Sequence, residues 1–177
     1  VCTMLMAAVA FTAGCGGAKK SDKKVLKVGM ECAYAPYNWS QTKADGGAVK
    51  IAGSNEYAYG YDVMMAKKLA DSMGADLEIH KIEWDGLAPA VVSGKIDAAI
   101  AGMSITSKRK ETVDFTKPYY YATVVALVKK DSEQAKAQSV ADLKGSVATS
   151  QLNTIWYDQI DQVPDVKKLP AIDTVPG

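Results

Sequence analysis

The sequence has few of the residues that carry covalent or metal chemistry, with three cysteines and one histidine among 177 residues. Cys2 and Cys15 belong to the N-terminal leader described below, so Cys32 has no partner for an internal disulfide. No CxxC pair or Cys/His cluster offers a metal site. A Cys–His or Ser–His catalytic pair would require His80, which falls inside a predicted strand at residues 77–82. We therefore expect no metal and no catalytic residue, and interpret Cys32 and His80 as structural.

The chain also lacks a charge excess of either sign. Its 21 Lys+Arg and 20 Asp+Glu residues give a formal net charge of +1 at pH 7. A dedicated nucleic-acid surface needs a strong basic excess, so no nucleic-acid partner is expected. The composition is that of a soluble globular protein, and the length suffices to bury a substantial core. There is no internal repeat, no extended low-complexity segment and no sign of a cofactor.

At the N-terminus, the apolar run of residues 4–13 is too short to span a bilayer. It ends in small residues before Cys15, as a signal-peptide h-region does. Thr12-Ala13-Gly14-Cys15 resembles a bacterial lipobox, although that motif usually begins with a large aliphatic residue. A buried helix is the alternative, but the switch to glycine, lysine and serine at residues 16–24 favours a flexible tether. We expect a signal peptide at residues 1–15, lipidation of Cys15, and an extracytoplasmic location, periplasmic or at the surface of a bacterial cell.

The most informative stretch is residues 84–121. Asp85 stands where a helix N-cap is expected, and Gly94 is placed to end that helix in the left-handed conformation. Residues 96–103 form a short apolar run without helical length, which indicates a strand buried on both faces. A small-residue turn with hydroxyl groups follows, and then Arg109, so an open α/β sheet would present this turn to a ligand beyond its strand ends. The alternative is an ordinary βαβ unit with a solvated basic turn.

Other elements are predicted before this stretch. Apolar runs indicate strands at residues 25–30 and 77–82. A helix opens with Gly-Tyr-Asp at residues 60–62 and ends at Gly74. A loop or short hairpin is expected around residues 49–51. The apolar face of the helix consists of Met65, Ala66, Leu69, Ala70 and Met73.

The stretch GKIDAAIAGMSITSKRKETVDFTKPYY resembles the signature region of the amino-acid-binding (family 3) extracellular solute-binding proteins, the receptors of polar amino acid ABC transporters. The resemblance runs from Val25 to Leu169 and includes VGMECAYAPYNW, GYDVMMAKKLADSMG, WDGLAPAVVSGKIDA and LKGSVATSQLNTIWYDQI. It implies an α/β, two-lobed periplasmic-binding-protein-like fold with a hinge between the lobes. It also implies two partners, a free L-amino acid and the permease subunits of an ABC importer. Because such proteins are longer, we expect this sequence to be C-terminally incomplete.

The resemblance divides the chain into lobe 1 at residues 25–121 and, at residues 122–177, a hinge crossing with the first part of lobe 2. Residues 122–128 are apolar and β-branched, which predicts a strand. Ser139 and Asp142 have the spacing of a capping box at the start of a short helix. Further along, residues 147–151 are predicted to form the first strand of lobe 2. Asn153 and Thr154 are predicted to cap a helix through Ile160.

A free amino acid brings two opposite charges out of water, and each needs a dedicated partner. Arg109 suits the carboxylate because its planar fork can donate two parallel hydrogen bonds. The Ser104 hydroxyl suits the ammonium, and the Gly102 backbone suits the carboxylate. By resemblance, Gly102, Met103, Ser104 and Arg109 are ligand-binding. Lys108 is taken as a surface residue.

Thr154 and the backbone N–H groups beside it form an anion seat where the family carries a Gly-Thr pair, with Asn153 here in place of glycine. A plain N-cap is the alternative. Tyr34 and Trp84 match positions where the family packs large side chains on either side of the ligand, and core packing is the alternative for Trp84. Glu31 matches the position at which members with basic ligands carry an acid.

These residues favour arginine, lysine or ornithine as the ligand, because Glu31 would face a distal cation between two rings. Glutamine or another polar amino acid is the alternative, since a carboxylate also accepts from an amide. Two other functions stay open on the same fold. One is the sensor domain of a kinase or channel. The other is an enzyme similar to the cyclohexadienyl dehydratases, for which Glu31 is the one titratable candidate.

Overall fold

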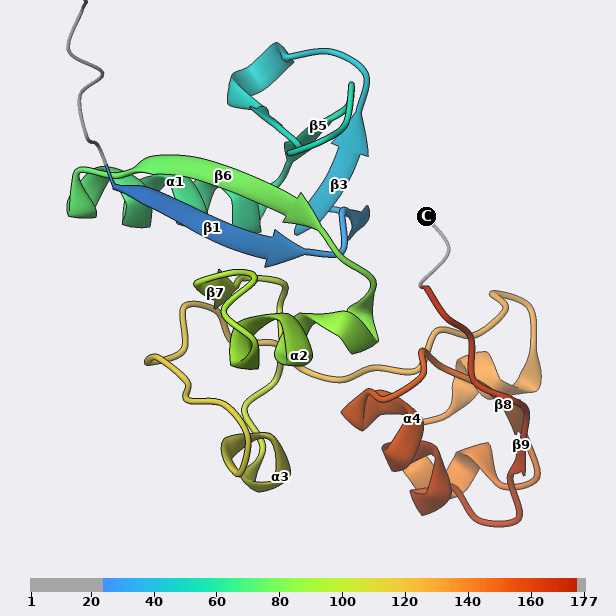
Figure 1. Cartoon of the computed structure of the whole chain (residues 1–177). Helices are drawn as coiled ribbons and strands as arrows, with labels where there is room; N and C mark the ends of the chain where they lie inside the picture. Colours follow the sequence, from blue (N-terminus) through green and yellow to red (C-terminus); the bar gives the residue numbers. More distant parts are fainter. Residues whose placement is uncertain (1–23, 175–177) are drawn as a thin grey trace, which may run out of the picture.

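The computed structural model describes residues 24–174, so the predicted leader, Cys15 and most of the predicted tether lie outside the described residues. At the centre of the first part, β1 (Val25–Met30) is flanked on both sides by parallel strands. One is β6 (Asp76–Lys81), which pairs with β1 along its whole length, and the other is β7 (Ala98–Ala99). The strand predictions at residues 25–30 and 77–82 are confirmed, the second within one residue. Figure 1 shows the long β1–β6 pair.

The predicted strand at residues 96–103 is shorter than expected. Its ladder on β1 contains Val28 with Ala98 and Gly29 with Ala99. After the ladder, the N–H of Ile100 still donates to the carbonyl of Gly29 at 3.1 Å. The residues that follow, 101–106, are outside any strand.

A second, antiparallel sheet has the strand order β2-β3-β5-β4. The turn η1 (Asp45–Gly47) precedes β4, and the hairpin expected around residues 49–51 is confirmed as β4 paired with β5. The isolated bridge from Ile51 to Ile79 joins this sheet to β6. The strands are β2 (Ala33–Tyr34), β3 (Asn38–Gln41), β4 (Val49–Lys50) and β5 (Tyr57–Tyr59).

The helix predicted after residues 60–62 is α1 (Tyr61–Met73), and Gly74 ends it with a φ of 62°, as expected. The predicted apolar face is wrong in part, because Leu69 and Met73 are exposed. Ala66 and Ala70 are buried as predicted, and these small side chains let the helix backbone approach β6 closely. Asp62 and Val63 are buried beside them.

After β6 the chain forms η2 (Trp84–Gly86) and then α2 (Leu87–Val92), which packs against β1. Asp85 is not the N-cap of α2, because it lies inside the 3-10 turn and Gly86 takes that position. Gly94 follows the helix with a φ of 72°, as predicted. Next comes α3 (Ser107–Lys110), whose N-cap Thr106 accepts a hydrogen bond from the backbone of Arg109 at 3.1 Å.

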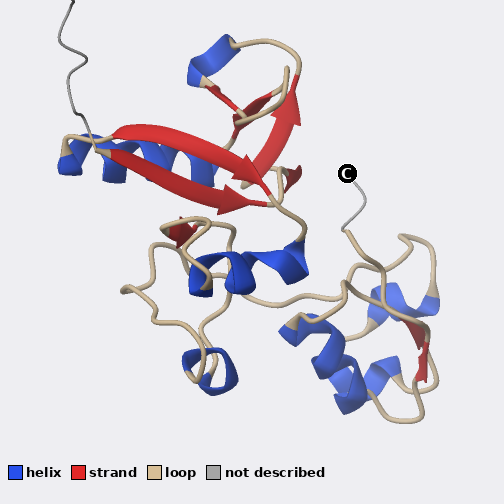
Figure 2. Cartoon of the chain, in the orientation of Figure 1, coloured by secondary structure: helices blue, strands red, loops and turns tan. Residues whose placement is uncertain are grey.

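The strand predicted at residues 122–128 is wrong, since this segment has no regular structure. A β-branched run forms a strand only beside a backbone that can pair with it, and within residues 24–174 no segment does so. Val125 and Leu127 are consequently 81% and 100% exposed. Figure 2 shows this segment as part of a long loop linking the two parts of the molecule.

The second part is built from short pieces. Ser139 and Asp142 form the predicted capping box at the start of η4 (Val140–Leu143). Residues 147–151 form only the two-residue strand β8 and one bridge, from Gln151 to Ile172. Thr154 caps the helix as predicted, and Asn153 before it has a φ of 55°. The remaining elements are η3 (Glu133–Lys136), β8 (Val147–Ala148), α4 (Ile155–Gln159), η5 (Ile160–Gln162) and β9 (Lys167–Lys168).

The two residues interpreted as structural lie in the first part. Cys32 is buried, and this burial raises the pKa of its thiol to about 12, so the thiol is protonated at neutral pH. His80 lies in β6 with its Nε2 atom 2.7 Å from Oε1 of Glu78. Across residues 24–174, no helix combines the length and apolar character that a membrane-spanning segment needs.

Candidate functional site

Arg109 lies where the two parts of the molecule meet. Its Nη1 atom donates to the carbonyl of Ser104 at 2.8 Å, and its Nη2 atom donates to the carbonyl of Asn153 at 3.0 Å. The guanidinium carbon lies 5.4 Å from the centroid of the Trp84 ring. Burial lowers the pKa of Arg109, an effect that Asp158 opposes. Lys108 is exposed, as predicted.

In the second part, the carbonyl of Asn153 accepts both of the hydrogen bonds that Arg109 and Trp84 donate across the junction. The bond from Nε1 of Trp84 is 3.3 Å long. The left-handed conformation of Asn153 presents this carbonyl just before α4 begins. A guanidinium and an indole N–H from the first part therefore hold one backbone oxygen of the second.

Thr154 is buried, and its hydroxyl is engaged within its own segment. The hydroxyl donates to the carbonyl of Gln151 at 2.7 Å and accepts from the backbone of Tyr157 at 3.2 Å. The bond from Tyr157 is that of an N-cap residue, so the capping interpretation describes this structure.

A second contact between the parts involves Glu31, which is 5% exposed. Its Oε1 atom accepts from Nε2 of Gln151 at 2.9 Å, and the same amide nitrogen donates to the carbonyl of Asp173 at 3.0 Å. Burial raises the pKa of the Glu31 carboxyl, the Gln151 hydrogen bond lowers it, and the nearby carboxylates of Glu83 and Asp85 raise it. The Glu31 carboxyl group is thus buried, hydrogen-bonded to Gln151 and near two other carboxyl groups.

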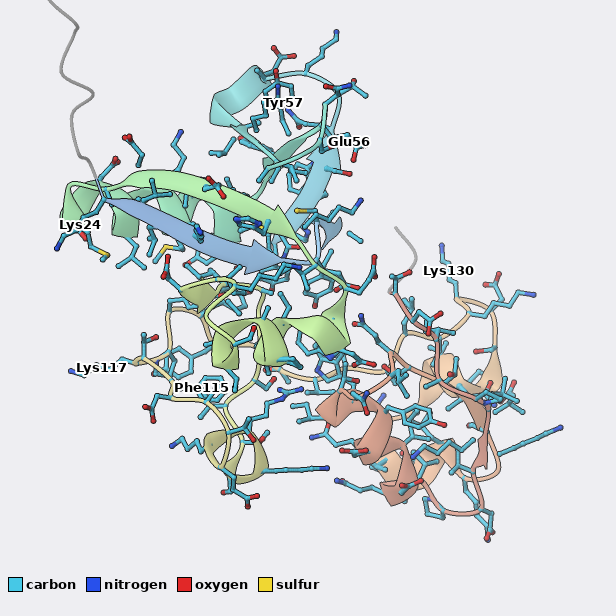
Figure 3. All side chains as sticks on the ribbon, in the orientation of Figure 1. Lys24, Glu56, Tyr57, Phe115, Lys117 and Lys130 are labelled. Atoms are coloured by element: carbon cyan, nitrogen blue, oxygen red, sulfur yellow. The ribbon has the colours of Figure 1, made fainter. Side chains whose placement is uncertain are left out.

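The larger of two clefts beside these contacts has a volume of about 310 Å³. It is bounded by the turn at residues 102–105, by the loop after α3 and by the start of α4. Two of its lining residues, Phe115 and Lys117, are labelled in Figure 3 on that loop. Met103 and Ser104 also line it, so the predicted ligand-binding turn faces this cleft.

The ring of Tyr34 lines this cleft as well. It stacks on Tyr37 with centroids 5.1 Å apart, and it lies 6.0 Å from the ring of Trp156 in α4. Trp84 lies elsewhere, in a second cleft of about 250 Å³ together with Glu83, Asp85, Leu152 and Asp173. The structure therefore does not bring the two predicted ligand-sandwiching residues face to face.

Residues 26–168 match the model of the bacterial extracellular solute-binding proteins, family 3. The chain belongs to this family. Among its relatives, the arginine-binding extracellular protein ArtP of Bacillus subtilis is 33% identical over 140 residues, which are 79% of this chain and 49% of that protein. The ABC transporter arginine-binding protein 1 of Escherichia coli is 32% identical over 158 residues, 89% of this chain and 56% of that protein.

A solved structure agrees with the sequence relatives. An ancestral arginine-binding protein bound to glutamine superposes with a TM-score of 0.69 at 33% identity, over 86% of this chain and 61% of that one. The mixed α/β fold is therefore that of two-lobed periplasmic binding proteins. The chain spans about half the length of the curated relatives it matches.

Two residues that contact the candidate site of this solute-binding protein, Gln151 and Tyr119, are not among the predicted site residues. Gln151 was assigned to a strand, although a polar residue at the end of a predicted strand is a signal that it faces a site. Tyr119 is not singled out by the sequence. Its hydroxyl accepts from the N–H of Gly102 at 2.9 Å, the backbone group that we expected to face a ligand carboxylate.

Proposed function

We propose that this chain belongs to an extracytoplasmic receptor that captures a free L-amino acid and delivers it to an ABC importer. The observation that carries the proposal is the position of Arg109, held by Ser104 beside a cleft and reaching across to the second part. The names of the relatives, which are amino-acid-binding proteins, support the same function. Hinge closure is the mechanism, with no bond made or broken.

The proposed binding step is an exchange of acceptors on Arg109. The Asn153 carbonyl is a neutral acceptor on Nη2, whereas a ligand carboxylate would form a charge-assisted and therefore stronger hydrogen bond. Asn153 and Thr154 would then close over the carboxylate from the second part. Gly102, Met103 and Ser104 would border the α-amino acid group from the first.

The test is Arg109→Ala in the full-length protein, with Lys108→Ala as the matched control. Loss of a partner from a buried ion pair costs about 3–5 kcal/mol, enough to turn micromolar affinity into millimolar. We expect calorimetry with L-arginine and L-glutamine to show this loss for Arg109→Ala and no change for Lys108→Ala. A dissociation constant within threefold of wild type in Arg109→Ala would remove this residue from the site.

For the ligand, we propose a basic amino acid such as arginine, lysine or ornithine. Glu31, Glu83 and Asp85 place negative charge close together at the junction, which would favour a distal cation. Tyr34 and Trp84 are proposed to contact the ligand side chain from separate sides of the junction. A polar amide such as that of glutamine is the competing ligand, and the ancestral relative bound to glutamine supports that alternative.

A thermal-shift panel of the twenty amino acids distinguishes these ligands. We expect arginine or lysine to give the largest shift and Glu31→Gln to erase most of the preference over glutamine. A charged and a neutral hydrogen bond differ by about 1–2 kcal/mol, so the expected preference is about tenfold. If glutamine gives the largest shift in the wild type, Glu31 does not recognise a cation.

We also propose that Cys15 is lipidated and anchors the protein to the cell membrane. The support is the apolar leader followed by Thr12-Ala13-Gly14-Cys15. Cell fractionation tests it, since Cys15→Ser should move the protein from the membrane fraction to the soluble fraction. Persistent membrane association of the variant would contradict lipidation at this position.

A further inference from the structure

A chain of hydrogen bonds runs from the turn that borders the larger cleft to the buried side chains of Asp62 and Asn38. The N–H of Gly102 donates to the hydroxyl of Tyr119 at 2.9 Å, and that hydroxyl donates to Oδ1 of Asp62 at 2.8 Å. The other carboxylate oxygen, Oδ2, accepts from Nδ2 of Asn38 at 2.7 Å. Asn38 in turn accepts from the N–H of Cys32 at 2.8 Å.

Asp62 is the centre of this chain of bonds. Its side chain and that of Asn38 are fully buried. A carboxylate without solvent needs a hydrogen-bond donor on each oxygen, and here Tyr119 and Asn38 supply them. Burial raises the pKa of Asp62, while the bonds from Tyr119 and Asn38 lower it. The site of Asp62 therefore requires a side chain whose two terminal atoms both accept hydrogen bonds.

The turn itself has little else to hold it. Gly102 has a φ of 63° and carries no Cβ atom, so side-chain sterics at this residue do not hold the turn in one arrangement. Within the described part of the chain, two hydrogen bonds reach the backbone of residues 102–105. One is the Gly102–Tyr119 bond, and the other is the bond from Arg109 to Ser104. Tyr119 therefore fixes the start of the turn, and Arg109 binds at its other end.

We propose that Asp62 and Tyr119 are positioning residues for amino acid recognition, an inference that rests on the proposed function. By holding the Gly102 N–H, Tyr119 sets the direction in which the turn carries the Ser104 carbonyl, and that carbonyl orients the Arg109 guanidinium. Because the Tyr119 hydroxyl donates its hydrogen to Asp62, the lone pairs of the hydroxyl oxygen are available to the N–H of Gly102. Neither residue needs to touch the ligand.

Tyr119→Phe is the first test, because it removes the hydroxyl and keeps the ring. Tyr61→Phe is the matched control, since the Tyr61 hydroxyl donates to the carbonyl of Tyr119 at 3.1 Å and its ring stacks on the same residue. We expect Tyr119→Phe to raise the dissociation constants for L-arginine and L-glutamine about tenfold, the scale of one lost hydrogen bond. Tyr61→Phe should leave them unchanged.

Hydrogen exchange at the Gly102 amide gives a readout that does not depend on any ligand. Exchange should accelerate in Tyr119→Phe and stay at the wild-type rate in Tyr61→Phe. If Tyr119→Phe lowers the melting temperature but changes neither affinity nor Gly102 exchange, the network is structural and the proposal is overturned.

Substitutions at Asp62 and Asn38, made singly and together, test which side chain donates and which accepts in the hydrogen bond between them. In Asp62→Asn the new amide nitrogen faces that of Asn38, so two donors meet. In Asn38→Asp two carboxylates meet. The double variant restores every pair, because Asp at position 38 accepts from Cys32 and from the new Asn at position 62, whose oxygen accepts from Tyr119.

We expect each single variant to weaken amino acid binding and accelerate Gly102 exchange, and the double variant to recover both to within about threefold. Failure of the double variant to recover either would overturn the proposal. If the wild type binds none of the twenty amino acids, the proposed function fails. Gly102 exchange in Tyr119→Phe then still decides whether Tyr119 positions the turn.

Discussion

Residues 24–121 and residues 122–174 differ in what holds them together. In the first part, most of the buried apolar side chains form one cluster around β1, from Leu26 to Ala101. In the second part, the buried side chains among the described residues are both polar, Gln151 and Thr154. Gln151 bonds to Glu31 across the junction, and Thr154 caps the helix that follows Asn153.

The difference shows two ways of giving a segment its shape. A long central strand such as β1 pairs on both sides and buries its side chains, so the hydrophobic effect acts on it. The pieces of the second part are too short to bury an apolar face. They are held by local hydrogen bonds, such as the bond from the backbone of Ser139 to Asp142, and by contacts with the first part.

The largest expected effect comes from removing apolar volume in the first part. Leu87 is fully buried against β1, and Leu87→Ala should lower the free energy of unfolding by about 2–5 kcal/mol. Leu169→Ala is the matched change in the second part, where the side chain is 38% exposed, and should cost about 1 kcal/mol or less. Urea unfolding followed by circular dichroism measures both. Equal losses would mean that the second part has an apolar core of its own.

A smaller effect is expected at the junction. Gln151→Leu removes the donor to the buried Glu31 carboxylate and should cost about 1–3 kcal/mol near pH 8. Burial raises the pKa of Glu31 above its ordinary value of 4.5, so the folded protein binds the proton more tightly than the unfolded chain. The stability that Glu31 contributes is present when it is protonated and is lost as the pH rises through its folded pKa.

Gln151→Leu should raise that pKa further, because the Gln151 hydrogen bond lowers it. The deficit of the variant should therefore shrink as the pH falls toward 4.5. Urea unfolding between pH 4.5 and 8 checks this dependence. In a Glu31→Gln background, the cost of Gln151→Leu should not change with pH. A deficit that is constant with pH would mean that Gln151 stabilises the junction without Glu31.

The smallest effect is expected within the second part. Thr154→Val removes the hydroxyl that caps α4 and should cost about 1 kcal/mol. Thr149→Val is the control, because Thr149 is exposed and its hydroxyl bonds only to the carbonyl of Pro170, so its loss should cost less than about 0.5 kcal/mol. Thermal unfolding distinguishes them. If both changes are neutral, local capping does not hold this part together.

Several predictions with a local cause succeeded, although the N-cap predicted at Asp85 did not. Gly74 and Gly94 end helices in the left-handed conformation, and Thr154 caps α4, because each depends on residues within one helical turn. The strand at residues 122–128 failed for the opposite reason. Its β-branched residues favour an extended conformation, but a strand also needs a neighbouring backbone with which to pair.

The candidate site divides in the same way. Arg109 lies five positions after Ser104, so their closeness could be expected from the residues alone. Tyr34 and Trp84 were predicted to flank one ligand, yet they line different clefts. No sequence pattern indicates the distance between two loops that follow different strands.

The sequence by itself determined the family, the central strand, helix α1 and the turn that precedes Arg109, since periodicity, caps and motif spacing act over a few residues. Only the tertiary structure decided which partners the buried charges have. Glu31 meets Gln151 from 120 positions away, and Asp62 meets Tyr119 from 57 positions away. These pairs exist because strand order and the long crossing bring distant segments together. A buried carboxylate then requires whatever donor the fold places beside it.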